Sequence, residues 1–301
     1  MELHVLGSGG FMPFPDAHLP GFLVRHQGRN YIFDAGEGTQ TRMVEAGLSR
    51  ADLEAVFISH LHGDHVLGLP GLLIRRSQEG DPDRPVAIFG PKRLREFLDN
   101  TQETLQYRLT FESRYQDLCH GRIISLDRVW VGTVAMNHRV ETYGFVIGPR
   151  DKKRKFHPKQ ARELGVPEGP LWGKLQEGAT VELDDGTVVE PEQVSDPPQP
   201  GPKLVYLPDT RPVDAFPDGF KNPDILIHEG MFLEEHQEHA VNKKHSTARE
   251  AAGVAKKLNA GKLILTHRSR RYTNEQRFLD EARDVFIDTE LAHDGQSFTV
   301  G

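Results

Sequence analysis

The densest group of reactive side chains in the 301-residue sequence is His60-Leu61-His62-Gly63-Asp64-His65. It directly follows the apolar run Ala55-Val56-Phe57-Ile58, which predicts a strand that ends at this loop. Imidazole and carboxylate groups suit zinc, manganese or iron, and a compact loop lets them converge on two adjacent ions. The alternative is a polar turn with incidental histidines, and further His and Asp residues later in the chain favour the metal site.

Three later residues complete a candidate ligand set, because each comes just after an apolar run. A lone histidine after a strand is more often a hydrogen-bonded core or surface residue, but a series of such positions after the first motif favours ligands. Strands of one sheet can present such residues along one edge. The sequence therefore predicts a catalytic two-metal site, with the further ligands His138 (after residues 134–136), Asp209 (after 203–207) and His267 (after 262–266).

Short apolar runs bounded by Gly, Pro or Asp recur along the chain and alternate with a few helical patterns. Strands that cluster in this way predict an α/β (α+β) fold of two sheets packed face to face with helices outside. The predicted strands lie near residues 3–6, 22–24, 31–33, 56–58, 86–89, 129–136, 145–147, 204–207, 225–227 and 263–265. The predicted helices cover residues 66–77, 91–103, 246–258 and 274–284.

Composition indicates an ordinary soluble protein, with 37% hydrophobic and 27% charged residues. No signal peptide is visible, and no apolar run approaches the roughly 20 residues needed to span a bilayer. The single cysteine, Cys119, excludes an internal disulfide and fits a reducing compartment. We therefore expect a cytoplasmic protein without a membrane partner.

The net charge of −7 hides a strong asymmetry. The segment from Arg150 to Lys174 contains eight Lys or Arg residues and three acidic residues, so its net charge is 8 − 3 = +5. The net charge of the rest of the chain is therefore −7 − 5 = −12. The surrounding stretch holds a predicted helix (158–164), a hairpin with its turn at Asp185-Gly186, and a proline-rich end (197–202). We interpret residues 149–200 as an arm inserted into a single domain of residues 1–301. The basic residues of this arm are expected to form a polyanion-binding patch, and a solvated basic loop is the alternative.

Several longer motifs are similar to those of a known family. They are Phe33-Asp-Ala-Gly-Glu-Gly-Thr-Gln40, residues 57–72 around the histidines, Gly169-Pro-Leu-Trp-Gly-Lys-Leu175, Asp209-Thr-Arg-Pro212, Ile227-His-Glu229, His245-Ser-Thr-Ala-Arg249 and Leu265-Thr-His-Arg-Ser-Arg-Arg-Tyr272. Nearly end to end, the chain resembles the metallo-β-lactamase fold superfamily and, within it, the ribonuclease Z family of tRNA 3′-processing endonucleases. The first histidine motif identifies only the superfamily, whereas the His-Ser-Thr and Gly-Pro-Leu segments point to ribonuclease Z.

The resemblance implies two zinc ions and a role for each ligand. One zinc would be bound by His60, His62 and His138, the other by Asp64, His65 and His267, with Asp209 bridging both. Asp64 would also accept the proton of the attacking water, and His245, oriented by Glu229, would protonate the departing 3′ oxygen. A surface carboxylate at a strand end is the alternative for Glu229. Asp34 would support the ligands from behind, or simply cap its strand.

The resemblance also implies precursor tRNA as the substrate and a homodimer in which one subunit's arm helps to hold the tRNA cleaved by the other. Backbone phosphates would be contacted without sequence readout, so binding should weaken steeply with salt. Trp172 is more simply explained as an anchor of the arm's own core than as a stacking residue. Arginines 268, 270 and 271 either pair with substrate phosphates or are solvated. The candidate substrate contacts are Lys152, Lys153, Arg154, Lys155, Gly169, Pro170, Lys174 and Arg271.

Two segments depart from the family pattern. Residues 11–20 lack the Arg-Asn pair common there, which leaves the preferred substrate end open, and Pro208 replaces a glycine before Asp209. Other functions on the same scaffold remain as alternatives. They are a small-molecule or cyclic phosphodiesterase, a hydrolase of lactones, thioesters or β-lactams, and an RNA-binding protein with a fossil site.

Overall fold

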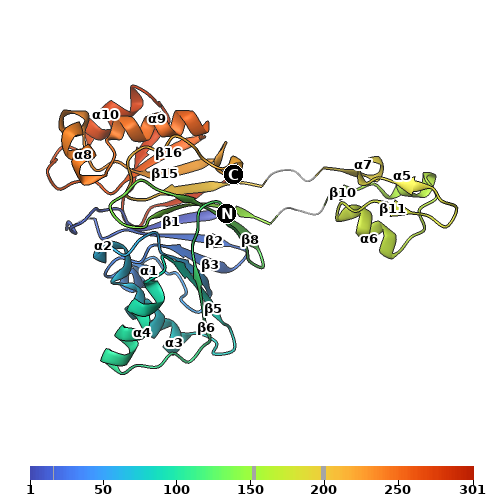
Figure 1. The fold of residues 1–301 in the computed structure, drawn as a ribbon, viewed down its shortest axis with the longest axis horizontal. Coiled ribbons are helices and arrows are strands. Elements are labelled where there is room, and N and C mark those ends of the chain that lie inside the picture. Colours follow the sequence, from blue (N-terminus) through green and yellow to red (C-terminus); the bar gives the residue numbers. More distant parts are fainter. Residues whose placement is uncertain (16, 151–153, 198–200) are drawn as a thin grey trace. The chain divides into compact units, whose positions relative to one another are not determined.

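The computed structural model describes residues 1–15, 17–150, 154–197 and 201–301, which form two compact units. The larger unit comprises Met1–Pro149 and Pro202–Gly301, and the smaller comprises Arg150–Gly201. In the larger unit two seven-stranded sheets pack together, and helices cover their outer faces (Figure 1). The predicted architecture of two packed sheets with outer helices is therefore confirmed. In the described part of the chain, no helix is long and apolar enough to cross a membrane.

The first sheet has the strand order β18-β1-β2-β3-β4-β5-β6, and β3 to β6 run parallel to one another. Its strands are β1 (Glu2–Gly7), β2 (Gly21–His26), β3 (Arg29–Phe33), β4 (Leu53–Phe57), β5 (Val86–Gly90), β6 (Ser113–Asp117) and β18 (Ser297–Thr299). The helices on this side are α1 (Thr39–Glu45), α2 (Gly63–Val66), α3 (Leu69–Glu79) and α4 (Leu94–Leu105). Because β1 pairs with β18, the two ends of the chain lie side by side.

The second sheet has the order β17-β16-β15-β14-β9-β8-β7, and β14, β15 and β16 run parallel. Its strands are β7 (Ile123–Ser125), β8 (Val129–Ala135), β9 (Tyr143–Pro149), β14 (Leu204–Leu207), β15 (Ile225–Glu229), β16 (Lys262–Thr266) and β17 (Thr289–Leu291). The helices on this side are α8 (Gln237–Lys243), α9 (Ala248–Leu258) and α10 (Gln276–Arg283), with short 3-10 turns at Asp218–Phe220 and Glu234–His236. Every strand predicted from an apolar run is present.

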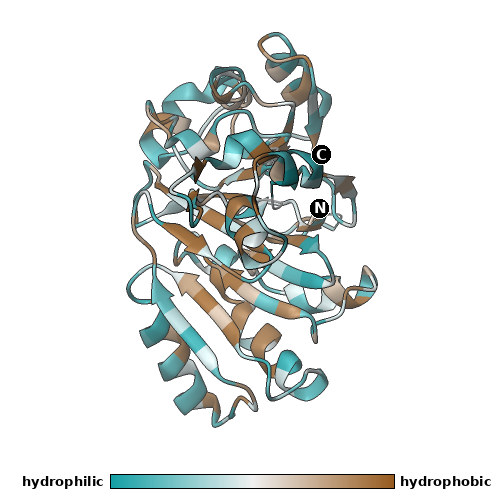
Figure 2. Cartoon of the chain, turned by 90° about the vertical axis from the view of Figure 1, so that its right-hand side faces the viewer, coloured by the Kyte–Doolittle hydropathy of each residue, from teal (hydrophilic) through white to brown (hydrophobic). Residues whose placement is uncertain are grey.

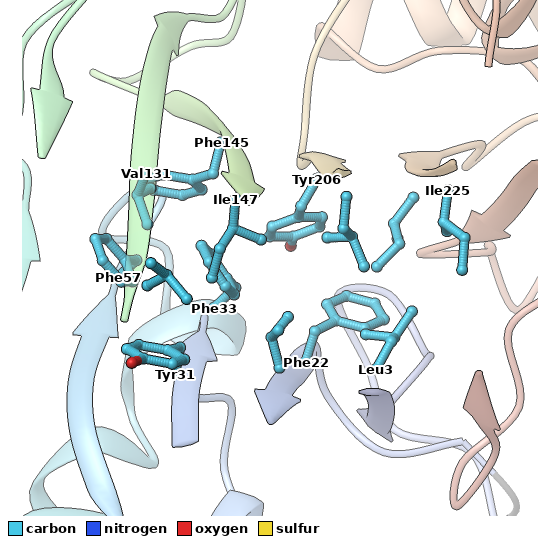
Figure 3. Close-up of a cluster of buried hydrophobic side chains, with 14 of the residues drawn as sticks. Leu3, Phe22, Tyr31, Phe33, Phe57, Val131, Phe145, Ile147, Tyr206 and Ile225 are labelled. Atoms are coloured by element: carbon cyan, nitrogen blue, oxygen red, sulfur yellow. The ribbon is translucent and has the colours of Figure 1, made fainter. Parts of the chain in front are cut away.

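Alternation of side chains along the strands builds the three hydrophobic layers. In β3, Tyr31 and Phe33 join the cluster between the sheets, whereas Ile32 faces the outer helices. Figure 3 shows the central cluster, in which the rings of Phe33 and Phe145 from opposite sheets lie 5.4 Å apart. Hydrophobic residues are frequent along the strands, and the helices carry both hydrophobic and hydrophilic residues (Figure 2). Burying each such large side chain contributes about 1.5–3 kcal/mol.

Two helix predictions can be compared residue by residue. Helix α9, predicted over residues 246–258, begins at Ala248 after Thr247, which forms a capping box with Glu250. The helix predicted from residue 66 instead begins at Leu69, and residues 63–66 form the separate turn α2. Between these two helical segments, Gly68 packs closely against the backbone, and a Cβ atom there would lie 1.9 Å from the carbonyl oxygen of Gly36. Asp64 and His65 lie on α2.

The smaller unit has its own core of six buried aliphatic side chains, Ala161, Val166, Leu175, Val181, Val189 and Val194. Trp172 packs against this core and donates a hydrogen bond to the carbonyl oxygen of Val166 at 3.2 Å, so its expected anchoring role is confirmed. The predicted hairpin around Gly186 is also present. The elements are β10 (Lys155–Phe156), α5 (Pro158–Glu163), α6 (Pro170–Gln176), β11 (Val181–Glu182), β12 (Val188–Val189), α7 (Pro191–Val194) and β13 (Ser195–Asp196).

Candidate metal centre

The candidate ligands gather at the edge of the larger unit where strands from both sheets end. Asp209, Glu229 and His267 lie at or just beyond the carboxyl ends of the parallel strands β14, β15 and β16. The first histidine motif follows β4, which belongs to the other sheet. The seven predicted ligands contribute to converging groups of donor atoms: His60, His62, His138 and Asp209 form the first, and Asp64, His65 and His267 form the second. Asp209 also contacts His65 and His267 of the second group, and it forms a third group with His245 and His267.

The first group consists of three imidazoles and one carboxylate oxygen. His62 Nδ1 lies 3.0 Å from His60 Nε2 and 3.3 Å from His138 Nε2. Asp209 Oδ2 lies 3.7 Å from His60 Nε2 and 3.8 Å from His138 Nε2. These four atoms all lie within 4.8 Å of one another.

The second group uses the other oxygen of the same carboxylate. Asp209 Oδ1 lies 3.2 Å from His267 Nε2 and 3.4 Å from His65 Nε2. Asp64 Oδ2 lies 3.4 Å from His267 Nε2 and 3.6 Å from His65 Nε2. Asp209 thus stands between the groups and presents one oxygen to each. Pro208 has not displaced this side chain, which is only 2% exposed.

Both groups fit a bound zinc ion. Ligand atoms held tetrahedrally at about 2.0–2.1 Å from zinc lie about 3.3 Å from one another, close to the separations found here. Two of the atoms, His65 Nε2 and Asp209 Oδ1, are buried and make no hydrogen bond with any described residue. A buried polar atom without a partner is costly, and a metal ion would satisfy both.

Asp34 fixes the orientation of the ligands from behind. This fully buried carboxylate accepts hydrogen bonds from the Ser59 backbone N–H, the Ser59 hydroxyl and the Tyr206 hydroxyl at 2.7–2.8 Å. His65 Nδ1 lies 2.7 Å from its Oδ2, so Nδ1–H donates to Asp34 and leaves the Nε2 lone pair for a metal. Of the two interpretations of Asp34, these contacts favour support of the ligands over simple strand capping. No sequence pattern pointed to Tyr206, which comes from the second sheet.

Two other histidines are oriented in the same way. His138 Nδ1 lies 2.9 Å from the carbonyl oxygen of Lys244, which can only accept a hydrogen bond. His60 Nδ1 lies 2.9 Å from the Ser59 hydroxyl, whose own proton goes to Asp34. In both rings Nδ1 must carry the proton, so Nε2 is free to bind a metal.

The charged groups at the centre favour binding of a cation. Burial lowers the pKa of His65, but Asp209 and Asp34 outweigh burial and raise that pKa well above its ordinary value. Burial raises the pKa of Asp209, yet the neighbouring His267 and His65 hold it well below its ordinary range. Asp209 therefore stays ionised in a buried site, and a bound divalent ion would balance its charge in place of protons on the neighbouring imidazoles.

His245 lies beside the paired groups and is held by Glu229. Its Nδ1 is 3.0 Å from Glu229 Oε1, and its Nε2 is 3.9 Å from Asp209 Oδ2. Glu229 is fully buried and also accepts hydrogen bonds from the backbone N–H groups of Thr210, Met231 and Ser246, so it is no surface carboxylate. Burial lowers the pKa of His245, but Glu229 and Asp209 outweigh it and raise that pKa. The side chain is thus suited to hold and release a proton.

Arg211 connects the Asp209 loop to the segment that carries His245. Its Nη1 donates to the His245 carbonyl oxygen at 2.6 Å and to Glu250 Oε2 at 2.7 Å, and its second nitrogen pairs with Glu250 Oε1. Glu250 in turn belongs to the capping box of α9. This connection was not predicted, although Arg211 directly follows Asp209-Thr210 in one of the family motifs.

A cavity of about 650 Å³ opens over the two groups. His62, His138 and Asp209 line it together with Arg139 and Lys243, which add positive charge. The loop of residues 11–13 also lines this cavity. The cavity gives an anionic substrate access to both donor groups.

Most of the predicted substrate contacts belong to the smaller unit. Lys152 and Lys153 lie outside the described residues. Lys155, Gly169, Pro170 and Lys174 are exposed on the smaller unit. Arg154, by contrast, pairs with Glu192 at 2.6 Å and donates to the Ser195 hydroxyl, so its guanidinium is already engaged.

The arginines after His267 do not behave alike. Arg268 is 7% exposed and paired with Glu275, so the prediction that it reaches substrate phosphates or is solvated was wrong. Arg271 is exposed, and its guanidinium lies 5.8 Å from the centre of the Phe232 ring. For Arg271 the phosphate contact stays a prediction.

Comparison with known proteins supports the fold and identifies the family. A family model described as "Anti-Pycsar protein Apyc1" matches residues 1–148. Ribonuclease Z of Shouchella clausii is 39% identical over 98% of this chain and 95% of its own length, and that of Salinibacter ruber is 39% identical over 96% and 91%. The crystal structure of human tRNase Z, short form, superposes with a TM-score of 0.70 at 26% identity and covers all of both chains.

The two packed sheets and the paired His/Asp groups at their common edge define a metallo-β-lactamase fold hydrolase. Divalent metal binding follows from the donor sets themselves. With identities of this size over the whole length, the chain belongs to the ribonuclease Z family.

Proposed function

We propose that the protein is a metal-dependent endoribonuclease that removes the 3′ trailer from tRNA precursors and leaves a 3′-hydroxyl on the tRNA. Full-length similarity to ribonucleases Z supports this activity. The structural observation that carries it is the placement of His245, whose imidazole is held by Glu229 and whose Nε2 is 3.9 Å from Asp209 Oδ2. A proton donor at this place would speed hydrolysis of a phosphodiester, because the departing oxygen is a poor leaving group until it is protonated.

The proposed cofactor is a pair of zinc ions, one in each donor group. Such a pair, when bound, lowers the pKa of a shared water and stabilises the charge that develops on the phosphate during in-line displacement. Asp209 would bind both ions, since its two oxygens already face the two groups. The remaining ligands would be His60, His62 and His138 in one group, and Asp64, His65 and His267 in the other.

Two side chains of the protein, Asp64 and His245, carry out the proposed proton transfers. Asp64 accepts the proton that the attacking water gives up; although burial raises its pKa, His267 and His65 lower it, so the carboxylate is available as a base. His245 Nε2 donates a proton to the departing 3′ oxygen. Glu229 keeps the ring in place and stabilises its charged form.

The smaller unit is the proposed tRNA-binding arm. Its exposed Lys155, Lys159 and Lys174 would contact backbone phosphates without reading the sequence. By resemblance to its family, we further propose that the protein acts in the cytoplasm as a homodimer. Sedimentation equilibrium should then give about twice the chain mass of 33.9 kDa.

The test is cleavage of a 3′-extended tRNA precursor, with and without a zinc chelator, followed by mapping of both new ends. A metal-dependent cut beside the discriminator base that leaves a 3′-hydroxyl is expected. Absence of a cut, together with brisk hydrolysis of a small phosphodiester, would move the function to the phosphodiesterase alternative.

A further inference from the structure

Three exposed apolar side chains, Phe11, Met12 and Leu67, line the cavity that several candidate ligands also line. Phe11 is 69% exposed and Met12 is 48% exposed, and both line the cavity together with the ligands His62 and Asp209. Neither is buried in a core, so folding does not explain them. Their position over the candidate metal centre suggests a partner that presents a flat apolar surface there.

The loop that carries them is firmly closed at its base. Asp294 accepts hydrogen bonds from the Ser8 backbone at 2.9 Å, the Ser8 hydroxyl at 2.8 Å and the His18 backbone at 2.8 Å. The Gly9 N–H donates to the His18 carbonyl oxygen at 2.8 Å. One buried carboxylate therefore holds both ends of the loop.

Close packing and a cationic contact also hold the loop. A Cβ atom on Gly9 would lie 2.9 Å from the Ala17 carbonyl oxygen, so the two sides of the loop approach closely. Arg270 lies over the Phe14 ring at 5.7 Å and contacts Met12 Sδ at 3.9 Å. Because these contacts hold the base of the loop together with Met12 and Phe14, a ligand that binds beside them would lose less free energy to ordering the loop.

Other lining residues provide the opposite chemistry. Arg139 follows the ligand His138, and Lys243 precedes His245 by two residues. Arg139 donates to the Asn242 carbonyl oxygen at 3.0 Å, which ties these two segments together. Phosphates suit the cationic segment, whereas a nucleobase suits the aromatic one.

We infer that Phe11 and Met12 form a stacking platform for the nucleobase of the first trailer nucleotide. This inference rests on the proposed function, because His245 then protonates the 3′ oxygen of the last retained nucleotide. The last retained nucleotide then lies near His245 and Lys243. The nucleotide after the scissile phosphate therefore lies near Phe11. Stacking tolerates every base, so the platform would accept trailers of different sequence.

Cleavage kinetics test the platform with paired substrates. One precursor has a normal first trailer nucleotide, and the other is abasic at that position. Phe11→Ala should lower kcat/KM on the normal precursor by about 5- to 100-fold, the range expected for loss of one base–aromatic stack. On the abasic precursor Phe11→Ala should lower kcat/KM by no more than about twofold, because that precursor has no base to stack at this position. Phe11→Trp should retain activity, because tryptophan also stacks on a base. Ile287→Ala, a change at an apolar residue that is 80% exposed and does not line the cavity, is the matched control.

A binding measurement keeps the inference independent of catalysis. The zinc-loaded protein is mixed with a precursor whose scissile 3′ oxygen is replaced by methylene and whose first trailer base is 2-aminopurine. Wild type should quench the fluorescence by stacking, and Phe11→Ala should not, with equal zinc content in both.

The outcomes separate the two proposals. Equal losses on normal and abasic precursors, or quenching only when 2-aminopurine occupies the last retained position, would overturn the platform. If wild type fails to cleave the precursor, the proposed function fails, and the fluorescence result still decides whether the trailer base stacks on Phe11.

Discussion

The two compact units differ in how they hold their functional side chains. In the larger unit the candidate ligands are buried or half-buried, come from both sheets, and are oriented by further hydrogen bonds such as those of Asp34. In the smaller unit Lys155, Lys159 and Lys174 are exposed, come from one continuous segment, and belong to a unit with a core of six buried residues.

The difference follows from the physical demands of the two tasks. Metal binding and proton transfer require atoms to be placed within a few tenths of an ångström, so they need a large core and supporting contacts. Attraction to a phosphate backbone is long-ranged and tolerant of position, so a small unit suffices. The two regions should therefore respond very differently to mutation.

The largest effect is expected at the buried centre. Asp64→Ala removes both a proposed ligand and the proposed base, so cleavage should fall by about 10⁴-fold or more. The measurement is single-turnover cleavage of a precursor, with zinc determined in the same preparation. Retained activity in protein with full zinc content would rule out the role of Asp64. Asp218→Ala, an exposed aspartate in a short 3-10 turn, is the control.

His245→Ala should have the next largest effect. Loss of a general acid slows the chemical step by about 10²- to 10⁴-fold, while zinc content should stay at two per chain. Loss of metal would instead make His245 a ligand. The exposed His293 offers a matched control, since His293→Ala should change neither rate nor zinc content.

Removal of the smaller unit should separate binding from chemistry. A Gly-Ser linker in place of residues 150–201 should reduce tRNA turnover on the order of 100-fold because the arm's cations no longer neutralise phosphates, yet leave hydrolysis of a small phosphodiester within about twofold. Equal losses of activity on tRNA and on the small phosphodiester would contradict the proposal that the smaller unit serves tRNA binding and the larger unit serves catalysis. Thermal unfolding of the remaining unit should stay cooperative, because its two sheets are built without this segment.

The smallest effect is expected from single exposed lysines of the arm. Lys155→Ala or Lys174→Ala should weaken tRNA binding a few-fold and reduce the slope of log K against log salt by about 0.7–0.9 for each phosphate that is no longer neutralised. Lys221→Ala serves as the control, since Lys221 is paired with Asp218 in the larger unit. An unchanged salt slope for both arm variants would place the tRNA-binding surface elsewhere.

Much of the fold could be predicted because the sheets are built from apolar runs with turn residues between them. The runs at Tyr31–Phe33 and Ile225–Ile227 were visible because alternate residues face two different hydrophobic layers. Strands β6 and β7 were missed, since their sequences Ser113–Asp117 and Ile123–Ser125 are polar or very short. Helix α1 was also missed, because it is short and only Thr39 and Met43 are buried.

The sequence by itself determined the chemistry of the centre: which imidazoles and carboxylates are present, and that each follows a strand. Only the tertiary structure decided how these groups are arranged and which residues contact them. Asp209 has one oxygen toward each group, Tyr206 reaches Asp34 across the sheets, and Arg268 is buried against Glu275 rather than free for substrate. Side-chain type and local spacing are encoded along the chain, whereas these distances depend on how two sheets meet, and that is fixed by packing between residues far apart in sequence.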